Sequence, residues 1–445
     1  MKVARYAVMM LIVLSLLLSA CGGAATTPAP KATEAPAAVE EPAATEEPAA
    51  GEEITVILPK HESDLVGFWP ARIKDFEAET GIKVTLINMS WDKAADKILA
   101  EMAAGGSAYD VIEYDNGWVA KFCQAGWLEP MDGYMPDGYT DGMVPGLVSL
   151  FSCNGKVDGV VWNNDIRFFL YNTEMLEKAG IEAPPKTWDE LVSQCKTMQD
   201  QGIVETCLAQ PWEQSWAMAN EWHFFTYAFG GKMLDEGNNF AWNRDGSVEA
   251  LQYMSDMLNK DEVVSEASLT FNQEAAANVF LAGEAAFFTQ AWPSLYSYAQ
   301  DPELSKIVGK VGVGLVPGKT EGVSAALALP EAMAIPVTSK HKEAAWKFIE
   351  FMSSKESNKM MADQIGAIPI YTELYTNPDL LEKYPYWEEY SAQLASAQGL
   401  MQVTWLDQWG QVAMVEAQKC MAGQQTAQEA VDAIYAQTKD FDGQP

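Results

Sequence analysis

The sequence predicts an α/β fold built on a mainly parallel sheet, because short strand-like runs alternate with helical segments. The strand-like runs are Ile54–Leu58, Lys83–Ile87 and Asp110–Ile112, each with the length of a buried strand. A helix containing Ile73–Phe76 separates the first two runs, and a helix at Asp92–Met102 separates the second from the third. Strands that alternate with helices in this way are typical of βαβ units, whose strands run parallel.

Caps and apolar periodicity indicate further helices. Thr187 and Glu190 form a capping box that begins a helix reaching Met198. A later helix presents one apolar face, because four residues follow the helical spacing: Ala345, Phe348, Ile349 and Met352. The last predicted helix is Thr426–Thr438, and the final third of the chain is rich in helices.

The composition argues against two kinds of partner. The chain has 445 residues, enough for a sizeable core, and a formal net charge of −33. Nucleic acids and anionic bilayers are both bound through clustered Lys and Arg, so this charge disfavours both partners. The chain also has 15 Trp and 16 Tyr, and we expect some of these rings to serve recognition while most lie in the core.

The N-terminus predicts export and lipid attachment. Lys2 and Arg5 precede an apolar run at Ala7–Leu18, which is short for a membrane span and typical of a signal peptide. Leu18-Ser19-Ala20-Cys21 resembles the lipobox of bacterial lipoproteins, in which the cysteine receives a diacylglyceryl group. We therefore expect a signal peptide over residues 1–20 and a lipidated Cys21 that begins a disordered Ala/Pro/Glu/Thr tether over residues 21–53. An ordinary signal peptide with an incidental cysteine is the alternative.

Export permits disulfides among the five cysteines that remain. Cys195 and Cys207 lie close in sequence around a predicted helix-to-strand turn, and Cys123 and Cys153 flank one loop-rich stretch. We expect these two pairs and a free Cys420. The alternative is that all of these thiols are free and buried.

Several short segments occur in an order that identifies a family. The most specific stretch joins Leu170-Tyr171-Asn172, Glu177–Ile181 and Pro184–Leu191. The other segments are Phe76–Val84, Ala103–Val111, Phe229–Gly231, Gly283–Phe287, Ala334–Ala345 and Gly423–Val431. Together they resemble the family 1 extracellular solute-binding proteins of ABC importers, of the maltose and multiple-sugar binding type. The resemblance covers nearly the whole chain after the tether.

The resemblance implies the two-lobed periplasmic-binding-protein type II fold, in which hinge-linked α/β lobes enclose a ligand cleft. By matching segments, the first lobe would comprise residues 54–164 with 332–369. The second lobe would comprise residues 165–331 with 370–445. The hinges would lie near Asn163–Arg167, Ala326–Glu331 and Ala367–Ile370.

Candidate ligand-binding residues follow the predicted strands, because open α/β sheets bind ligands at the carboxyl ends of their strands. His61 follows the first strand and Ser90 the second. The main candidates after the second and third strands are Trp91, Tyr114, Asp115 and Trp118. Flat rings suit the apolar faces of a sugar, and carboxylates accept hydrogen bonds from its hydroxyls. A simple turn at Asp115-Asn116-Gly117 is the alternative.

The resemblance adds candidates at the hinges and in the second lobe. Asp165 matches a sugar-binding carboxylate, and Arg167 shares its strand face, so the two either face the cleft or pair with each other. Glu331 replaces the small residues usual in its hinge, and either contacts ligand or faces solvent. The remaining candidates are Trp162, Trp212, Glu213, Trp216, Trp292, Trp405 and Trp409. Core packing is the alternative for Trp405 and Trp409.

The function implied is that of a membrane-anchored, extracytoplasmic protein that captures a carbohydrate by lobe closure and delivers it to ABC permease subunits. We expect a monomer with no cofactor, no metal and no catalytic activity. The same fold with a non-sugar ligand such as a polyamine is the first alternative. A secreted glycoside hydrolase is a remote alternative, because it would also use Trp and paired carboxylates. The chain has no Gly-x-Ser-x-Gly motif, and its three histidines lie far apart in sequence.

Overall fold

The computed structural model describes residues 51–241, 246–384 and 386–444. These residues fall within one compact unit, Ala50–Pro445. The predicted signal peptide, Cys21 and nearly all of the tether lie outside the described residues, so they stay predictions. The first strand begins at Glu53, one residue before the start expected from the sequence.

Five strands form the first sheet, in the spatial order β2-β1-β3-β11-β6. Their bounds are β1 Glu53–Pro59, β2 Lys83–Met89, β3 Val111–Asp115, β6 Val160–Asn163 and β11 Glu331–Ala334. Strand β1 pairs in parallel with β2 and β3, whereas β11 runs antiparallel to β3 and β6. The carboxyl ends of β1, β2, β3 and β6 therefore meet at one edge of the sheet, together with the amino end of β11.

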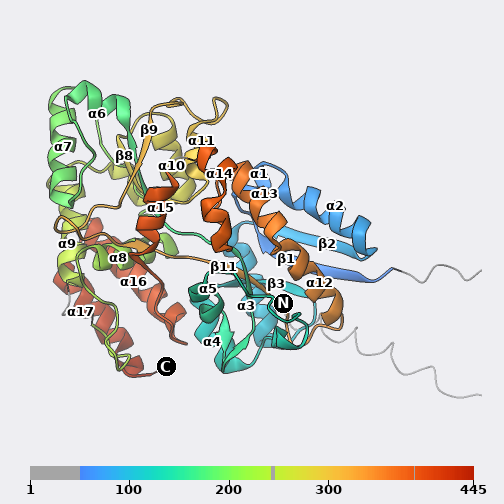
Figure 1. Ribbon diagram of the computed structural model, residues 1–445. Coiled ribbons are helices and arrows are strands. Elements are labelled where there is room, and N and C mark those ends of the chain that lie inside the picture. The colour runs from blue at the N-terminus through green and yellow to red at the C-terminus, as the bar shows by residue number, and fades with distance from the viewer. Residues whose placement is uncertain (1–50, 242–245, 385, 445) are drawn as a thin grey trace, which may run out of the picture. The chain divides into compact units, whose positions relative to one another are not determined.

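Helices α2 (Phe68–Thr80), α3 (Trp91–Ala104) and α12 (Lys342–Met352) pack against this sheet (Figure 1). Strands β1 and β3 are buried along most of their length, and β3 carries two buried carboxyl side chains, Glu113 and Asp115, near its end. Helices α2 and α3 end at Gly81 and Gly105, whose φ angles of 75° and 63° are left-handed, a conformation that favours glycine. The predicted apolar face of α12 is buried, as expected.

The second sheet has the order β8-β7-β9, with bounds β7 Phe168–Asn172, β8 Phe287–Ala291 and β9 Val311–Gly314. Both pairings are antiparallel, so the expectation of a mainly parallel sheet is wrong for this part of the chain. The reason is the path of the chain. Strand β7 continues directly from β6 of the first sheet, and β9 leads back toward β11 of that sheet, so β7 and β9 run in opposite directions.

Four helices from distant parts of the sequence form one packed group (Figure 1). They are α8 Trp216–Ala228, α9 Ser247–Asn259, α16 Leu406–Met421 and α17 Ala427–Thr438. The predicted final helix is α17, which begins after a capping box formed by Thr426 and Glu429. Thr187 caps the start of α7 (Trp188–Asp200) as expected, but the side chain of Glu190 does not complete the predicted capping box and accepts a hydrogen bond from Lys186 N at 2.8 Å instead.

Two chain segments that connect the sheets are hydrogen-bonded to each other. Arg167 N donates to Leu327 O at 3.0 Å, and Leu329 N donates to Asp165 O at 2.8 Å. These segments coincide with two of the predicted hinges. The strands also divide between the two sheets where the two lobes were expected to divide, although the lobe boundaries themselves stay a prediction.

Two disulfides are present, Cys123–Cys153 and Cys195–Cys207, the pairs expected from the sequence. Cys420 is buried on α16 and outside both disulfides. No helix in the described part of the chain is both long enough and apolar enough to span a membrane. The remaining helices are α1 Glu62–Leu65, α4 Val119–Ala125, α5 Pro145–Leu150, α6 Thr173–Ala179, α10 Gln273–Leu281, α11 Leu295–Ala299, α13 Lys355–Ile365, α14 Pro378–Lys383 and α15 Trp387–Leu394. The remaining strands are β4 Ser152–Cys153, β5 Lys156–Val157, β10 Ala326–Leu327 and β12 Ala397–Gln398.

Candidate ligand-binding site

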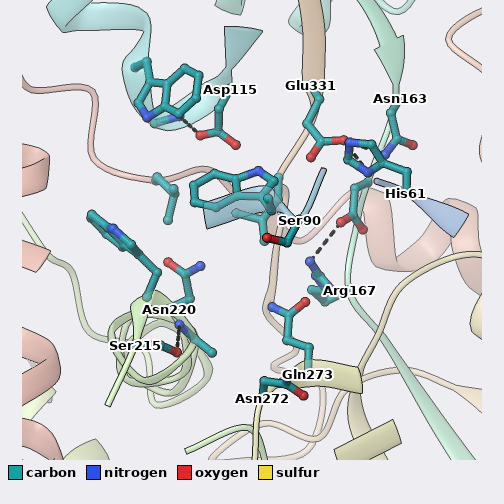
Figure 2. A pocket seen from close by; sticks show the side chains of 18 of the residues that line it. His61, Ser90, Asp115, Asn163, Arg167, Ser215, Asn220, Asn272, Gln273 and Glu331 are labelled. Atoms are coloured by element: carbon teal, nitrogen blue, oxygen red, sulfur yellow. Dashed lines mark hydrogen bonds and ion pairs between the residues drawn. The ribbon is translucent and has the colours of Figure 1, made fainter. Parts of the chain in front are cut away.

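A cavity of about 340 Å³ lies at the edge of the first sheet where the strand ends meet. Figure 2 shows Asp115, Glu331, Asn163 and His61 on one side of this cavity. On the opposite side lie residues from the starts of α8 and α10, including Asn220 and Gln273 (Figure 2). The cavity is therefore lined by the strand ends of the first sheet and by helix starts from the other part of the fold.

Asp115 ends strand β3 at the cavity and is nearly buried. Its Oδ1 accepts a hydrogen bond from Gly117 N at 2.7 Å, and burial raises the pKa of its carboxyl from 3.8 to about 7. A Cβ on Gly117 would lie 3.0 Å from Asp115 Oδ1 and 3.1 Å from Leu406 Cδ2, so glycine permits this tight turn. The turn that the sequence offered as an alternative therefore exists, and it presents Asp115 to the cavity.

Two tryptophan rings form an aromatic wall beside Asp115. The rings of Trp91 and Trp118 lie 6.0 Å apart at an interplanar angle of 36°, and both residues line the cavity. Trp118 stacks on Phe122 from α4 at 5.6 Å, which fixes its ring, whereas Trp91 is only half-buried at the start of α3. These three predicted residues, Trp91, Asp115 and Trp118, lie together at the cavity.

Asp165 and Arg167 both line the cavity and also pair with each other. Arg167 Nη2 lies 2.9 Å from Asp165 Oδ2, and their side chains are 8% and 11% exposed. The sequence left open whether these two residues face the cleft or pair with each other, and in the structure they do both. A buried ion pair of this kind needs further hydrogen bonds to satisfy its remaining polar atoms, so it suits a site for a polar ligand.

Glu331 begins strand β11 and lines the cavity. It is nearly buried, and its Oε2 accepts a hydrogen bond from Asn163 Nδ2 at 2.7 Å. Burial raises the pKa of this carboxyl well above its usual value. The alternative that Glu331 faces bulk solvent is therefore wrong.

The opposite side of the cavity is built from helix starts. Ser215 caps α8 and accepts a hydrogen bond from Ala217 N at 3.2 Å, and Asn272 caps α10 and accepts one from Ala275 N at 2.8 Å. The predicted residues Glu213 and Trp216 lie at the first of these starts and line the cavity. Partial positive charge at helix N-termini favours electron-rich ligand oxygens near these ends.

Trp162 and Trp292 lie at a small side cavity next to the main one. Both line this side cavity, which shares His61, Asn163 and Asp165 with the main cavity. Trp162 is buried, and its Nε1 donates to Glu113 Oε2 at 3.2 Å. The structure thus places these two predicted rings close to the main cavity but outside its lining.

Tyr114 and Trp212 are not at the cavity, so their prediction as ligand contacts is corrected. Tyr114 alternates with Asp115 along β3 and points to the opposite face, where it packs against Phe122 and Phe151 at 5.5 and 5.2 Å. Trp212 is fully buried, and its Nε1 donates to Glu221 Oε2 at 3.4 Å.

Trp405 and Trp409 are also core residues, which was the alternative for both. Trp409 stacks on Trp222 of α8 with ring centroids 6.0 Å apart. Trp405 lies against Phe240 and Phe441, at 4.8 and 5.7 Å. Trp409 thus packs within the helical group, Trp405 packs against segments that flank it, and neither residue lines the cavity.

The cavity also contains residues that the sequence did not single out as ligand contacts. They are Lys60, Gly117, Asn163, Ser215, Ala217, Asn220, Asn272, Gln273, Glu274, Leu329, Leu400, Leu406 and Asp407. Ser215 and Asn272 carry a signal that reveals them, because each is a helix-capping residue type immediately before an apolar helix. Gly117 lies in the turn that the sequence offered, and Asn163 and Leu329 lie in predicted hinges. The remaining residues carry no local signal, since only the tertiary fold brings them to the strand ends.

Comparison with known sequences identifies a family. The sequence model described as "Bacterial extracellular solute-binding protein" matches residues 62–359. A probable ABC transporter-binding protein of Deinococcus radiodurans is 27% identical over 318 residues, which are 69% of this chain and 74% of that protein. The arabinooligosaccharide-binding protein of Bacillus subtilis is 24% identical over 324 residues, which are 68% of this chain and 70% of that protein.

Solved structures share the fold. Maltose-bound MalE3 of T. maritima has a TM-score of 0.81 and 28% identity, and the match covers 87% of this chain and 99% of that one. A solute-binding protein from Agrobacterium radiobacter K84 in complex with ribitol has a TM-score of 0.80 and 21% identity, over 89% of this chain and 100% of that one. These matches confirm the predicted two-lobed fold class.

Proposed function

Because the chain belongs to the family of bacterial extracellular solute-binding proteins and is the binding protein of an ABC transporter, we propose that its ligand is a carbohydrate. The observation that carries this proposal is the cavity at the strand ends, where tryptophan rings alternate with carboxylates. Its volume of about 340 Å³ lies within the range of small-molecule sites, which is about 300–1,000 Å³.

The chemistry of the lining suits a sugar. The rings of Trp91, Trp118 and Trp216 offer flat apolar surfaces for the C–H faces of a pyranose or furanose. The carboxylates of Asp115 and Glu331 accept hydrogen bonds from hydroxyls. The remaining polar groups, which include Asp165, Arg167, Asn220, Asn272 and Gln273, line the same space. Weak contacts from both sides of the cavity would favour a closed form of the protein with ligand inside, and this requires no covalent step.

Delivery to a permease is the second part of the proposal. The N-terminal sequence supports lipid attachment at Cys21, and a tether of about 30 residues would hold the binding unit close to the membrane. A receptor held in this way captures solute at the membrane where the permease subunits lie. We infer an extracytoplasmic, monomeric lipoprotein that transfers its ligand without altering it.

The test is a ligand panel on protein lacking residues 1–21. Maltose, arabinooligosaccharides, mannitol and ribitol are screened by thermal unfolding, and at least one carbohydrate should raise the melting temperature. At a ligand concentration 100 times Kd the expected stabilisation is about 2.7 kcal/mol. The variant Trp91→Ala removes the half-buried ring of the aromatic wall and should abolish the shift while leaving the ligand-free protein folded.

The matched control is Trp127→Ala. Trp127 is a partly buried ring that packs on Phe122 outside the cavity, so its removal should lower stability and preserve binding. A panel that gives no shift with any carbohydrate would overturn the proposed ligand class. Product formation measured on the same panel separates a binding protein from a glycoside hydrolase.

A cationic ligand is the second candidate, and one observation favours it. Six carboxylates line the cavity, against two permanently charged cations, Lys60 and Arg167. Such an excess of negative charge also suits a polyamine. A melting shift with spermidine and none with the carbohydrate panel would select this candidate.

A further inference from the structure

His61 lies between two glutamates in the wall of the cavity. Its Nε2 is 3.5 Å from Glu113 Oε1, and its Nδ1 is 3.6 Å from Glu331 Oε2. The side chains of His61, Glu113 and Glu331 are 9%, 0% and 9% exposed. The three residues come from the segment after β1, from β3 and from β11, so the fold of the first sheet brings them together.

Each glutamate also has one neutral donor of its own. Trp162 Nε1 donates to Glu113 Oε2 at 3.2 Å, and Asn163 Nδ2 donates to Glu331 Oε2 at 2.7 Å. The Trp162 ring lies edge-on to the imidazole at 4.9 Å and limits its rotation. Each imidazole nitrogen therefore lies close to an oxygen of a different carboxylate.

This arrangement matches a doubly protonated imidazole. Neutral imidazole carries one N–H donor and one acceptor, whereas the charged form carries two donors. Two carboxylates facing two nitrogens satisfy the charged form, and with the neutral form one carboxylate would face a lone pair. A metal ion is the competing occupant, because one ring nitrogen of His61 and one carboxylate oxygen of each glutamate all lie within 4.8 Å of one another.

The other charged groups around His61 are mostly acidic. Asp64 on α1 accepts a hydrogen bond from the backbone N of His61 at 2.8 Å. A positive charge on His61 acts to lower the pKa of Asp115 at the end of β3. Asp165 acts on Glu331 from the connecting segment and is paired with Arg167. Lys60 is the adjacent residue and lines the cavity. Carboxylates from β3 and β11 thus lie beside the imidazole, and further carboxylates surround this cluster, so the local charge favours the cationic form of His61.

We propose that His61, Glu113 and Glu331 form a proton-binding site in the wall of the cavity, and that ligand and proton stabilise each other there. His61 acts in this site as a positioning residue that holds Glu331 at the cavity surface. The coupling to ligand rests on the proposed function, whereas the proton site itself does not.

The sign of the coupling follows from the removal of water. Ligand binding displaces water from the cavity, and buried carboxylates then lose solvation. The bound proton makes the net charge of the cluster one unit less negative. The occupied protein therefore retains the proton more strongly than the empty protein. Because such coupling is reciprocal, the protonated protein binds a neutral ligand more tightly.

The ligand-free protein provides the first test. The chain has three histidines, so long-range ¹H–¹⁵N spectra of labelled protein resolve each imidazole, and His61→Gln identifies the His61 signals. At pH 7 both His61 nitrogens should carry protons, and Glu331→Gln should shift the His61 transition to lower pH. His223 is the internal reference for a neutral ring, because burial lowers its pKa to about 3. A neutral His61 at pH 7 would overturn the proton site.

The second test measures the coupling with the carbohydrate that the panel identifies. Heats of binding in two buffers of different ionisation enthalpy should reveal proton uptake, and above the His61 transition the affinity should fall by up to about tenfold per pH unit. His61→Gln should remove this slope, whereas His341→Gln on the surface should retain it. Binding without proton uptake would overturn the coupling.

The experiments distinguish a failure of the proposed function from a failure of the proton site. The histidine spectrum needs no ligand, so a panel without binding affects the proposed function and leaves the proton site standing. Zinc chloride tests the competing occupant. If zinc raises the melting temperature of the wild-type protein and not of Glu331→Gln, the cluster is a metal site and the proton proposal is wrong.

Discussion

At the scale of single residues, burial of ionisable groups has the largest predicted effects. Glu221 lies on α8, is 3% exposed, and has Trp212 Nε1 as a hydrogen-bond donor at 3.4 Å. Burial raises the pKa of its carboxyl from 4.5 to about 8. A neutral hydrogen bond of this length offsets only a small part of the cost of burying the ionised form.

Glu221→Gln should therefore stabilise the protein at high pH. The folded state binds a proton at Glu221 that the unfolded state releases, so this group's contribution is fully present below pH 4.5 and is lost as pH rises toward about 8. At pH 9 the variant should be more stable than the wild type by a few kcal/mol, because each unit of difference between the folded and unfolded pKa of Glu221 corresponds to about 1.4 kcal/mol. Chemical denaturation at pH 4 and pH 9 measures this effect. Glu182→Gln on the surface is the control. The prediction would be contradicted if the difference in unfolding free energy between Glu221→Gln and the wild type were the same at pH 4 and pH 9.

The position of a residue after a strand was a reliable guide to the cavity. Trp91, Asp115 and Trp118 follow or end parallel strands and lie at the cavity edge. The prediction that Tyr114 contacts ligand was wrong because neighbouring residues in a strand point to opposite faces. The sequence alone did not show which face packs in the core. The prediction for Trp409 was wrong for a related reason, because the tertiary fold decides which neighbour a ring on a helix packs against.

At the scale of elements, the contact between α8 and α16 positions one wall of the cavity. Gly410 lies on α16 directly beneath the ring of Trp216, the first residue of α8. A Cβ added to Gly410 would lie 2.2 Å from Trp216 Cη2, which is far inside van der Waals contact. Glycine is unfavourable in a helix by about 1 kcal/mol relative to alanine, so its presence here reflects the close approach of the ring.

Gly410→Ala should displace the Trp216 ring and weaken ligand binding although residue 410 does not line the cavity. The steric cost should exceed the gain in helix propensity, giving a net loss of stability within about 1–3 kcal/mol. Tryptophan fluorescence, thermal unfolding and ligand titration measure these effects. Gly399→Ala is the matched control, because a Cβ there meets open space. Unchanged affinity in Gly410→Ala would show that the Trp216 ring does not contact ligand.

Helix ends were more predictable than strand directions. The cap at Thr187, the capping box at Thr426 and the glycine ends at Gly81 and Gly105 are local signals, and the structure has all of them. The direction of β8 and β9 depends on where distant connections return, which no local pattern records. The expectation of a mainly parallel sheet, drawn from the strand runs within residues 54–112, therefore does not extend to the second sheet, which is antiparallel.

At the scale of the whole molecule, the order of short motifs carried more information than any one of them. That order predicted the two-lobed fold, which the family match and the similar structures confirm. The same approach did not predict which side chains converge on the cavity from the helix starts. Residues such as Asn220 and Gln273 reach it only through the relative placement of helices far apart in sequence.

The proposed membrane attachment of the full-length chain depends on one residue, Cys21. Cys21→Ser should prevent lipid attachment and release the protein from membranes of a bacterial expression host, while ligand binding by the folded unit stays unchanged. Detergent phase partitioning and cell fractionation measure the release. Ala20→Gly keeps the cysteine and a small preceding residue, so it should preserve attachment. Membrane retention of Cys21→Ser would contradict the lipid anchor.

The hydrogen-bonded pair of connecting segments has a consequence for measurements of affinity. Asp165, Arg167, Leu329 and Glu331 lie on these segments, and all four also line the cavity. The predicted hinge segments thus also form part of the wall of the cavity. A substitution here changes both the strength of the ligand contact and the fraction of molecules in the binding-competent form, and an apparent dissociation constant is the intrinsic value divided by that fraction. An affinity measured for a variant on these segments therefore combines a change in ligand contacts with a change in the binding-competent fraction. A variant on the aromatic wall should change the ligand contacts alone.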